Sequence, residues 1–178
     1  MFFSSLLVMS KDTIVEVRTS VSEDNTPEKR LKDLTSDLNE HQGKMFRFEV
    51  FQENDIYSEA FPDGLVRVSS GMMEVMNDNE LLGIITHQMG HSYFEDALAS
   101  VTKPYSIRQE SSADEFGFLL CVEKEIEPYA VAMSLEKLSA LQKDSKTASK
   151  VKKMLSTHPD IEERMMRIRL LAEQNTKQ

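Results

Sequence analysis

Apolar and polar residues alternate with two different periods along the chain, one typical of strands and one of helices. The stretch M-F-R-F-E-V-F at 45–51 alternates apolar with charged residues, as a half-buried strand does. A Pro-Asp-Gly turn signal at 62–64 precedes L-V-R-V-S at 65–69, which predicts a second short strand. From Gly71 onward the apolar residues recur at helical spacing. This order predicts an α+β fold, with a small N-terminal mixed sheet followed by a mostly helical part.

Most of the expected helices carry a recognisable start signal. Thr26 and Pro27 open an amphipathic helix with leucines at 31, 34 and 38 on one stripe, which we expect to stop near Gly43. The later starts are Asn77 with Glu80, Ser106 with Gln109, Pro128, and His158-Pro159. The first two of these have the spacing of a capping box, which satisfies free backbone groups at a helix N-terminus. We expect their helices to run through residue 91 and to about residue 125.

The N-terminal stretch M-F-F-S-S-L-L-V-M-S at 1–10 is apolar enough to suggest a secretion signal. It lacks a basic region and a small-residue cleavage site, and no cysteine follows it for lipidation. We therefore expect these residues to form a strand or short helix packed against the fold, with a signal remnant as the alternative. No apolar run approaches the ~20 residues of a membrane helix, so no transmembrane segment is expected.

The composition is that of a soluble globular protein. With 178 residues, the chain is expected to form a single domain spanning 1–178. Apolar residues make up 40% and charged residues 29%, which argues against a disordered chain. The net charge of −9 argues against a nucleic-acid partner, because phosphates require a basic surface. The single Cys121 lies in an apolar run, where we expect a small core residue that does not indicate a redox compartment.

Candidate chemistry begins with the stretch T-H-Q-M-G-H-S at 86–92. His87 and His91 stand one helical turn apart, so their imidazoles project from one face and can take adjacent corners of a zinc tetrahedron. Paired histidines on a helix can equally be a polar surface. Gly83 and Gly90 weaken a helix, and glycines at these positions indicate close approach of another backbone.

A second candidate group is the acid pair in R-Q-E-S-S-A-D-E. Glu110 and Asp114 stand four apart on one helix face, where like charges repel unless a cation or histidine compensates. The repulsion is removed if Glu110 is a third zinc ligand and Asp114 hydrogen-bonds a ligating imidazole. The alternative interpretation is a solvated acidic helix face.

A third candidate group is S-T-H-P-D-I-E-E-R, with His158 directly before a helix-starting proline and Arg164 six residues later. By itself this pattern is typical of a capped helix N-terminus. His41, in N-E-H-Q-G, is expected to be an exposed contact at a helix C-terminus rather than a metal ligand.

Together, H-Q-M-G-H, E-S-S-A-D and S-T-H-P resemble the motifs of the zinc metallopeptidase family that includes HtpX, the CAAX prenyl protease and the Oma peptidases. The likeness covers about residues 24–171 and is greatest to small bacterial envelope peptidases of the LoiP type. It implies a zincin (gluzincin-like) arrangement of the helical part and a protein or peptide substrate.

The resemblance also implies a role for individual residues. The implied Zn²⁺ ligands are His87, His91 and Glu110. Asp114 would orient a ligating imidazole, His158 would stabilise the oxyanion, and Arg164 would brace the site. An exposed edge strand would pair with an extended peptide. The residues of that strand would be Leu65, Val66, Arg67 and Val68.

Three departures from the family pattern bear on function. The family carries H-E-x-x-H, and this chain has Gln88 at the glutamate position. The asparagine-alanine pair usual ahead of the edge strand is replaced by Tyr57-Ser58. The connection from His91 to Glu110 is short and leaves no room for a membrane-spanning insertion.

Position 88 determines the expected activity. The family mechanism needs a carboxylate that takes a proton from the attacking water and passes it to the leaving amine, which glutamine cannot do. We expect a zinc endopeptidase for unfolded or extended proteins, silenced in this chain by an engineered glutamate-to-glutamine change. The alternative is a natural pseudopeptidase that serves as a zinc-containing peptide-binding module. The resemblance favours protein quality control in the bacterial envelope, with the cytoplasm as the alternative location, and implies no oligomeric state.

Overall fold

The computed structural model describes residues 5–10, 13–18, 26–96 and 103–175, and it confirms the expected α+β class. A three-stranded sheet has β7 (Leu65–Ser69) as its central strand. β5 (Arg47–Phe51) pairs with β7 in parallel, and β6 (Ser58–Ala60) pairs with its other side antiparallel. A small hairpin of β3 (Glu40–His41) and β4 (Lys44–Met45) precedes β5. Both strands that the alternating pattern predicts are therefore present.

Helices make up most of the chain after the sheet, as the sequence predicts. In the described residues they are α1 (Pro27–Leu34), α2 (Ser70–Val75), α3 (Asp78–Tyr93), α5 (Ile107–Glu123), α6 (Ala130–Lys143), α7 (Ala148–Thr157) and α8 (Ile161–Asn175). Asn77 and Ser106 both form complete capping boxes, which confirms the expected starts of α3 and α5. α1 ends at Leu34, well before Gly43. Leu38 still reaches the core, from a turn after the helix in which its amide donates to the Thr35 carbonyl.

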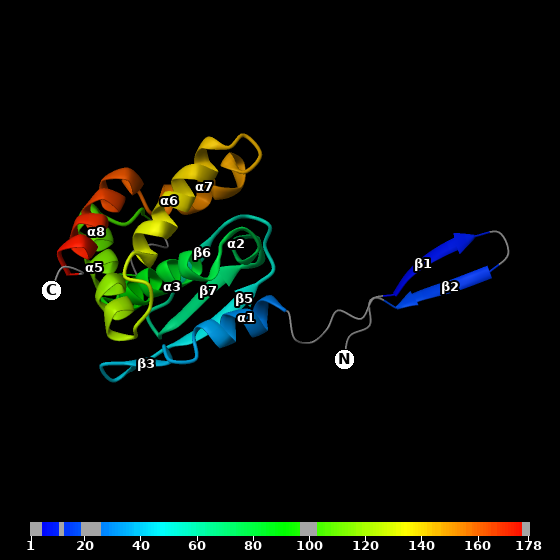
Figure 1. The fold of residues 1–178 in the computed structure, drawn as a ribbon, viewed down its shortest axis with the longest axis horizontal. Helices are drawn as coiled ribbons and strands as arrows, with labels where there is room; N and C mark the ends of the chain where they lie inside the picture. Colours follow the sequence, from blue (N-terminus) through cyan, green and yellow to red (C-terminus); the bar gives the residue numbers. More distant parts are fainter. Residues whose placement is uncertain (1–4, 11–12, 19–25, 97–102, 176–178) are drawn as a thin grey trace.

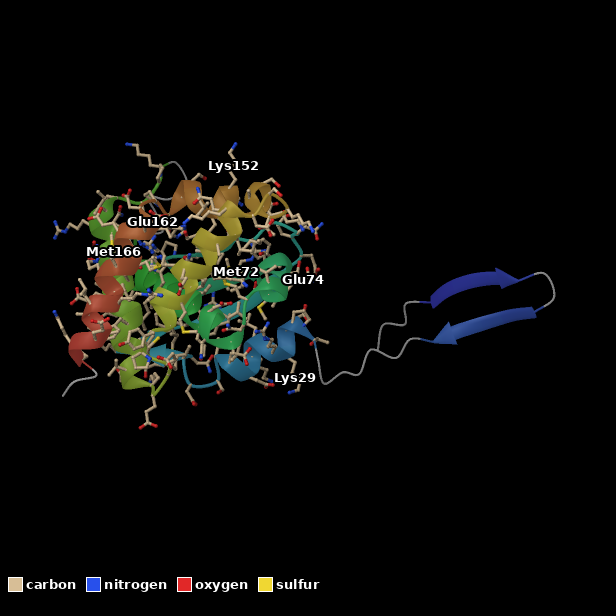
Figure 2. The ribbon with its side chains drawn as sticks, turned by 45° about the horizontal axis from the view of Figure 1, so that its top comes forward. Lys29, Met72, Glu74, Lys152, Glu162 and Met166 are labelled. Atoms are coloured by element: carbon tan, nitrogen blue, oxygen red, sulfur yellow. The ribbon has the colours of Figure 1, made fainter. Side chains whose placement is uncertain are left out.

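The helix α3 lies at the centre of the fold, between the sheet and the other helices (Figure 1). It packs against β6 and β7 on one side and against α5 and α6 on others. Every residue from Leu81 to Ser92 is buried, so this part of the helix has no solvent face. Side chains such as Lys152 and Glu162 project outward, whereas Met72 lies inside the core (Figure 2). Any polar side chain between Leu81 and Ser92 must consequently find its partners inside the protein.

The N-terminal residues differ from the expectation. β1 (Ser5–Ser10) pairs with β2 (Thr13–Arg18) in an antiparallel hairpin, and this hairpin stands apart from the other elements (Figure 1). A strand at this position is confirmed, but the expected packing against the fold is not found; residues 1–4 lie outside the described residues. Across the described ranges, no helix combines the length and the apolar character needed to cross a membrane.

Candidate metal centre

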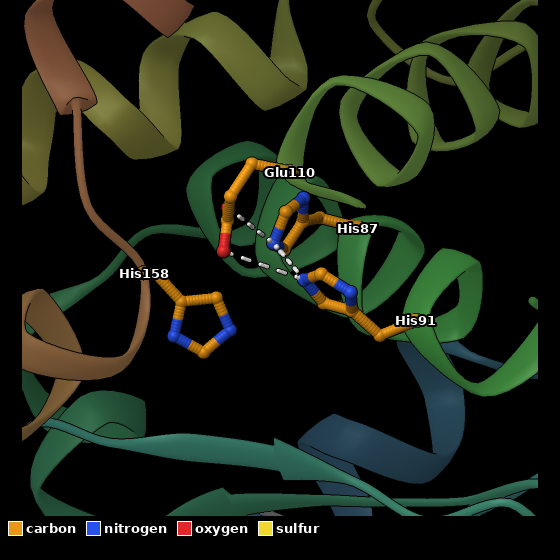
Figure 3. A group of neighbouring side chains, drawn as sticks. All are labelled: His87, His91, Glu110 and His158. Carbon is orange, nitrogen blue, oxygen red and sulfur yellow. Dashed lines mark hydrogen bonds and ion pairs between the residues drawn. The ribbon is translucent and has the colours of Figure 1, made fainter. Parts of the chain in front are cut away.

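Two histidines of α3 face each other in the interior. His87 and His91 are 2% and 0% exposed, and their Nε2 atoms lie 3.1 Å apart (Figure 3). The interpretation of this pair as a polar surface is therefore wrong. Cys121, from the neighbouring α5, is buried as expected, with its sulfur 3.6 Å from the Thr86 hydroxyl.

Close packing of α3 against α5 brings the acid pair of α5 next to these histidines. A Cβ built on Gly90 would lie only 2.8 Å from the Ala113 Cα, and one on Gly117 would lie 3.0 Å from the His87 backbone nitrogen. A real Cβ does not fit at the first distance and would be unusually tight at the second, so glycine allows the two backbones to approach this closely. Gly83 similarly allows the Ala130 backbone of α6 to approach α3. The close approach inferred from glycine in the sequence is thus confirmed.

Glu110 completes a set of three converging donor atoms. Its two carboxylate oxygens lie 3.6 Å from the His87 Nε2 and 3.7 Å from the His91 Nε2. Two ligands about 2.1 Å from a tetrahedral ion lie about 3.4 Å apart, so these spacings fit Zn²⁺ or a similar ion. Neither oxygen accepts a hydrogen bond of ordinary geometry within the described part of the chain. Buried acceptors left in this way, beside two imidazole nitrogens, are what a metal site presents.

Asp114 lies behind the histidines rather than among the converging atoms. Its Oδ1 is 2.9 Å from the His87 Nδ1, so it is placed to orient that imidazole. Arg164 of α8 donates to both of its oxygens at 2.9 and 2.7 Å, and Arg167 donates to Oδ2 at 3.0 Å. The Nη1 atom of Arg164 also lies against Glu110. Because both acids are fully buried, the interpretation as a solvated acidic face is wrong.

Burial controls the protonation of these groups. It lowers the pKa values of His87 and His91, so both imidazoles are neutral and able to ligate at pH 7. Burial raises the pKa of Glu110 to about 8, against the opposing effect of Arg164. Burial would also raise the pKa of Asp114, but the Arg164 guanidinium and its hydrogen bonds hold that pKa well below its usual range. The site thus contains one firmly ionised acid and one acid that must lose a proton to bind a metal.

The support of His91 was not expected from the sequence. Its Nδ1 lies 3.5 Å from the Asp96 Oδ2, and Gln109 donates to the other oxygen of Asp96 at 2.9 Å. The Tyr105 ring stacks on the His91 ring with centroids 3.7 Å apart and planes at 8°. His91 and Asp96 are five residues apart, which does not place them on one face of a helix, so no periodic pattern in the sequence predicts this contact.

His158 also reaches the site, from the segment between α7 and α8 (Figure 3). It is 3% exposed, and one of its nitrogens belongs to a group of four possible ligand atoms that all lie within 4.8 Å of one another. The other three are a nitrogen of His87, a nitrogen of His91 and a carboxylate oxygen of Glu110. Its Nε2 is 3.1 Å from the Gln88 Nε2, and Ser58 of β6 accepts from the same amide nitrogen at 3.0 Å. The alternative of a simple helix N-terminal cap is therefore wrong, because the imidazole points into the interior.

Two expectations need correction. The strand formed by Leu65, Val66, Arg67 and Val68 is not a sheet edge. It belongs to β7, whose two sides are occupied by β5 and β6, so no backbone there is left to pair with a peptide. His41 is not an exposed helix cap either, because it lies in β3, is 8% exposed and packs edge-on against Phe116.

Sequence comparisons agree with this geometry. The model of Peptidase family M48 matches residues 22–105 and 92–172. This chain belongs to Peptidase family M48. It is 28% identical to Metalloprotease LoiP of Escherichia coli strain K12, in an alignment covering 79% of this chain and 69% of LoiP. It is 27% identical to Metalloprotease YcaL of the same organism, over 79% of this chain and 68% of YcaL. The resemblance on which the site assignment rests is thereby confirmed at the level of the family.

Proposed function

We propose that this chain binds Zn²⁺ through His87, His91 and Glu110 and has the site of an endopeptidase for unfolded or extended proteins, silenced by Gln88. The observation that supports it most is the convergence of two imidazoles and one carboxylate, whose facing atoms lie 3.1 to 3.7 Å apart in a buried site. Two imidazoles and one glutamate form a donor set that catalytic zinc sites use. Residues 1–178 are proposed to form one metallopeptidase domain.

The chain's own residues would prepare this site for hydrolysis. When bound, Zn²⁺ would supply an activated water and polarise the substrate carbonyl. Asp114 holds the His87 ring through Nδ1, which directs Nε2 toward the Glu110 carboxylate. Arg164 keeps Asp114 ionised and braces Glu110. His158 would stabilise the oxyanion when its Nε2 carries a proton.

The substrate would pair with β6 instead of β7. The Tyr57 carbonyl and the Phe61 amide both bond to β7, at 2.9 and 2.8 Å. Because backbone groups alternate in direction along an antiparallel strand, those of Ser58 and Ala60 face away from β7. The Ile56 amide faces the same way and is taken by the Lys150 carbonyl of α7 at 2.9 Å. A peptide added as a strand would therefore lie along 58–60, beside Gln88. Because Ser58 and Ala60 are 0% and 6% exposed, the peptide would have to displace the atoms that now cover this side of β6.

Two measurements test metal binding and silencing separately. One Zn²⁺ per chain is expected by elemental analysis after reconstitution, and Glu110→Ala should abolish it. The Gln88→Glu variant should hydrolyse casein at least a hundredfold faster than the unchanged chain, because general base catalysis contributes about 10²–10⁴-fold. The gain should disappear with a metal chelator and in the Gln88→Glu/Glu110→Ala double variant. Gln142→Glu, which adds the same charge at an exposed position, should give no gain.

A second candidate function is a zinc-containing peptide-binding module in a natural pseudopeptidase. The observation in its favour is that Gln88 is fully buried and its amide nitrogen has two hydrogen-bond partners, which a glutamate could not serve as a donor. Zn²⁺ binding without any gain in Gln88→Glu, together with casein-peptide binding measured by fluorescence anisotropy, would favour this function. The family resemblance supports the bacterial envelope as the location, with the cytoplasm as the alternative, and cell fractionation tests it.

A further inference from the structure

The side chain of Gln88 is held at two points by residues far away in the sequence. Its Nε2 lies 3.0 Å from the Ser58 Oγ and 3.1 Å from the His158 Nε2. All three residues are at most 3% exposed, so no solvent competes for these hydrogen bonds. An amide nitrogen carries two protons, and here each proton has one acceptor. In this orientation both protons of the amide nitrogen are used, and the opposite orientation would require a proton on the His158 Nε2.

This arrangement determines which nitrogen of His158 carries the proton. The amide nitrogen of Gln88 can only donate, so the His158 Nε2 must accept. On the other side of the ring, Nδ1 lies 2.8 Å from the Thr157 Oγ1 and 3.3 Å from the Met154 carbonyl oxygen. The carbonyl can only accept, and the Thr157 hydroxyl already donates to backbone carbonyls of α7, so its oxygen accepts from Nδ1 as well. A ring whose Nε2 accepts a hydrogen bond carries a single proton, and the partners on both sides place that proton on Nδ1.

Ser58 continues the same chain of donors. Because its oxygen accepts from Gln88, its own proton is free to point elsewhere, and the Met154 sulfur lies 3.8 Å away. The Gln88 Oε1 is buried and accepts no hydrogen bond from any residue that the structure describes. The amide is thus positioned entirely through its nitrogen.

We propose that Ser58 is a positioning residue that holds the Gln88 amide, and that Gln88 in turn holds His158 as a hydrogen-bond acceptor. Its functional consequence rests on the proposed function: an imidazole with no proton on Nε2 cannot donate to an oxyanion from that atom. Glutamine at position 88 therefore silences the site twice, through the missing base and through the His158 tautomer. A glutamate at 88 accepts only, so it requires the proton on the His158 Nε2 and accepts from the Ser58 hydroxyl.

Nitrogen NMR of the full chain without metal tests both parts. In the metal-free chain, His158 should show a protonated Nδ1 and a bare Nε2, assigned by loss of the signals in His158→Gln. Gln88→Glu should move the proton to Nε2. Ser58→Ala should shift the Gln88 side-chain amide signal. Thr35→Val, which removes a buried hydroxyl that bonds only the Leu31 carbonyl of α1, should shift neither signal.

A double-mutant cycle measures the same contact by stability. Ser58→Ala should raise the unfolding equilibrium constant about tenfold in the Gln88 chain, because a buried donor loses its acceptor. In a Gln88→Leu chain the same change should have less than about a twofold effect. Equal effects in both chains, an unmoved amide signal, or a proton on the His158 Nε2 of the unchanged chain would overturn the proposal. These results do not depend on metal binding, so they are distinguishable from a failure of the proposed function.

Discussion

Replacing Arg164 with methionine tests whether a buried charge network holds the metal centre together. Arg164 is 3% exposed and makes hydrogen bonds of 2.9 and 2.7 Å to the two oxygens of Asp114. Its third guanidinium nitrogen lies against Glu110. Methionine retains much of the side-chain length and none of the donors, so both acids lose their main cation.

The expected cost follows from what remains after the change. Removing one partner of a buried ion pair typically costs about 3–5 kcal/mol. Arg167 stays 3.0 Å from Asp114 and compensates part of the loss, so we expect the lower end of that range, about 3 kcal/mol. Arg169→Met is the matched control. Its pair with Glu136 is 2.6 Å long but about half exposed on both sides, and such surface pairs contribute about 0–1 kcal/mol.

Urea unfolding at pH 7, with and without Zn²⁺, measures both variants. Arg164→Lys should fall between the unchanged chain and Arg164→Met, because it keeps the charge and loses the two-point contact. Added Zn²⁺ should recover only part of the loss, since it compensates Glu110 and not Asp114. If the free energies of unfolding of Arg164→Met and Arg169→Met agree within error, the charge network does not stabilise the site and the reasoning is wrong.

Two further predictions concern Zn²⁺ affinity, measured by competition with a chromophoric chelator. Asp114→Asn should weaken binding about 10–100-fold by releasing the His87 ring, while Asp37→Asn on the surface should have no effect; equal affinities would refute the role of Asp114. Between pH 6.5 and 8, affinity should rise with pH, because the Glu110 pKa of about 8 is raised and its proton must leave before the ion binds. The buried neutral histidines oppose this effect near pH 6.5, because they bind protons only in the unfolded chain. Between about pH 7.5 and 8, where they no longer titrate, the metal-free chain should become less stable as the raised pKa of Glu110 is approached, and a rise in stability there would contradict this assignment.

Local patterns predicted the histidine and acid pairs well. A helix places residues four apart on one face wherever it lies, so the relation of His87 to His91 depends only on that segment being helical. The capping boxes at Asn77 and Ser106 are equally local, and both formed as expected. Their success shows that these parts of the site are encoded within one or two helical turns.

The edge strand was mispredicted for a physical reason. A strand's own alternation shows which face is buried, but not which strands pair with it on either side. β6 is only three residues long, and S-E-A carries no strand signal of its own. The sequence pattern therefore does not reveal this short strand. The strand at 65–69, to which the resemblance assigns the edge position, has β6 on its outer side.

Contacts between distant segments cannot be predicted from local sequence patterns for the same reason. Ser58 and Gln88 are thirty residues apart and come from a strand and a helix, so no periodic pattern links them. Asp96 supports His91 only because the chain turns immediately after α3, where the Asp96 amide bonds the His91 carbonyl. Such partners depend on how the elements pack, which is determined by the whole core.

Position 88 links the stability of the site to its chemistry. A carboxylate there would be fully buried, and the polar atoms that now contact residue 88 belong to uncharged Ser58 and His158. An ionised carboxylate in such surroundings is strongly disfavoured unless a cation compensates it. Metal-free Gln88→Glu should therefore have a lower melting temperature than the unchanged chain. Zn²⁺ should then stabilise the glutamate variant more than the glutamine chain, because the ion offsets one more buried charge. Equal Zn²⁺-induced shifts in melting temperature would show that residue 88 does not sense the ion. A larger shift in the glutamate variant would mean that glutamine makes the metal-free site more stable and, at the same time, removes the general base.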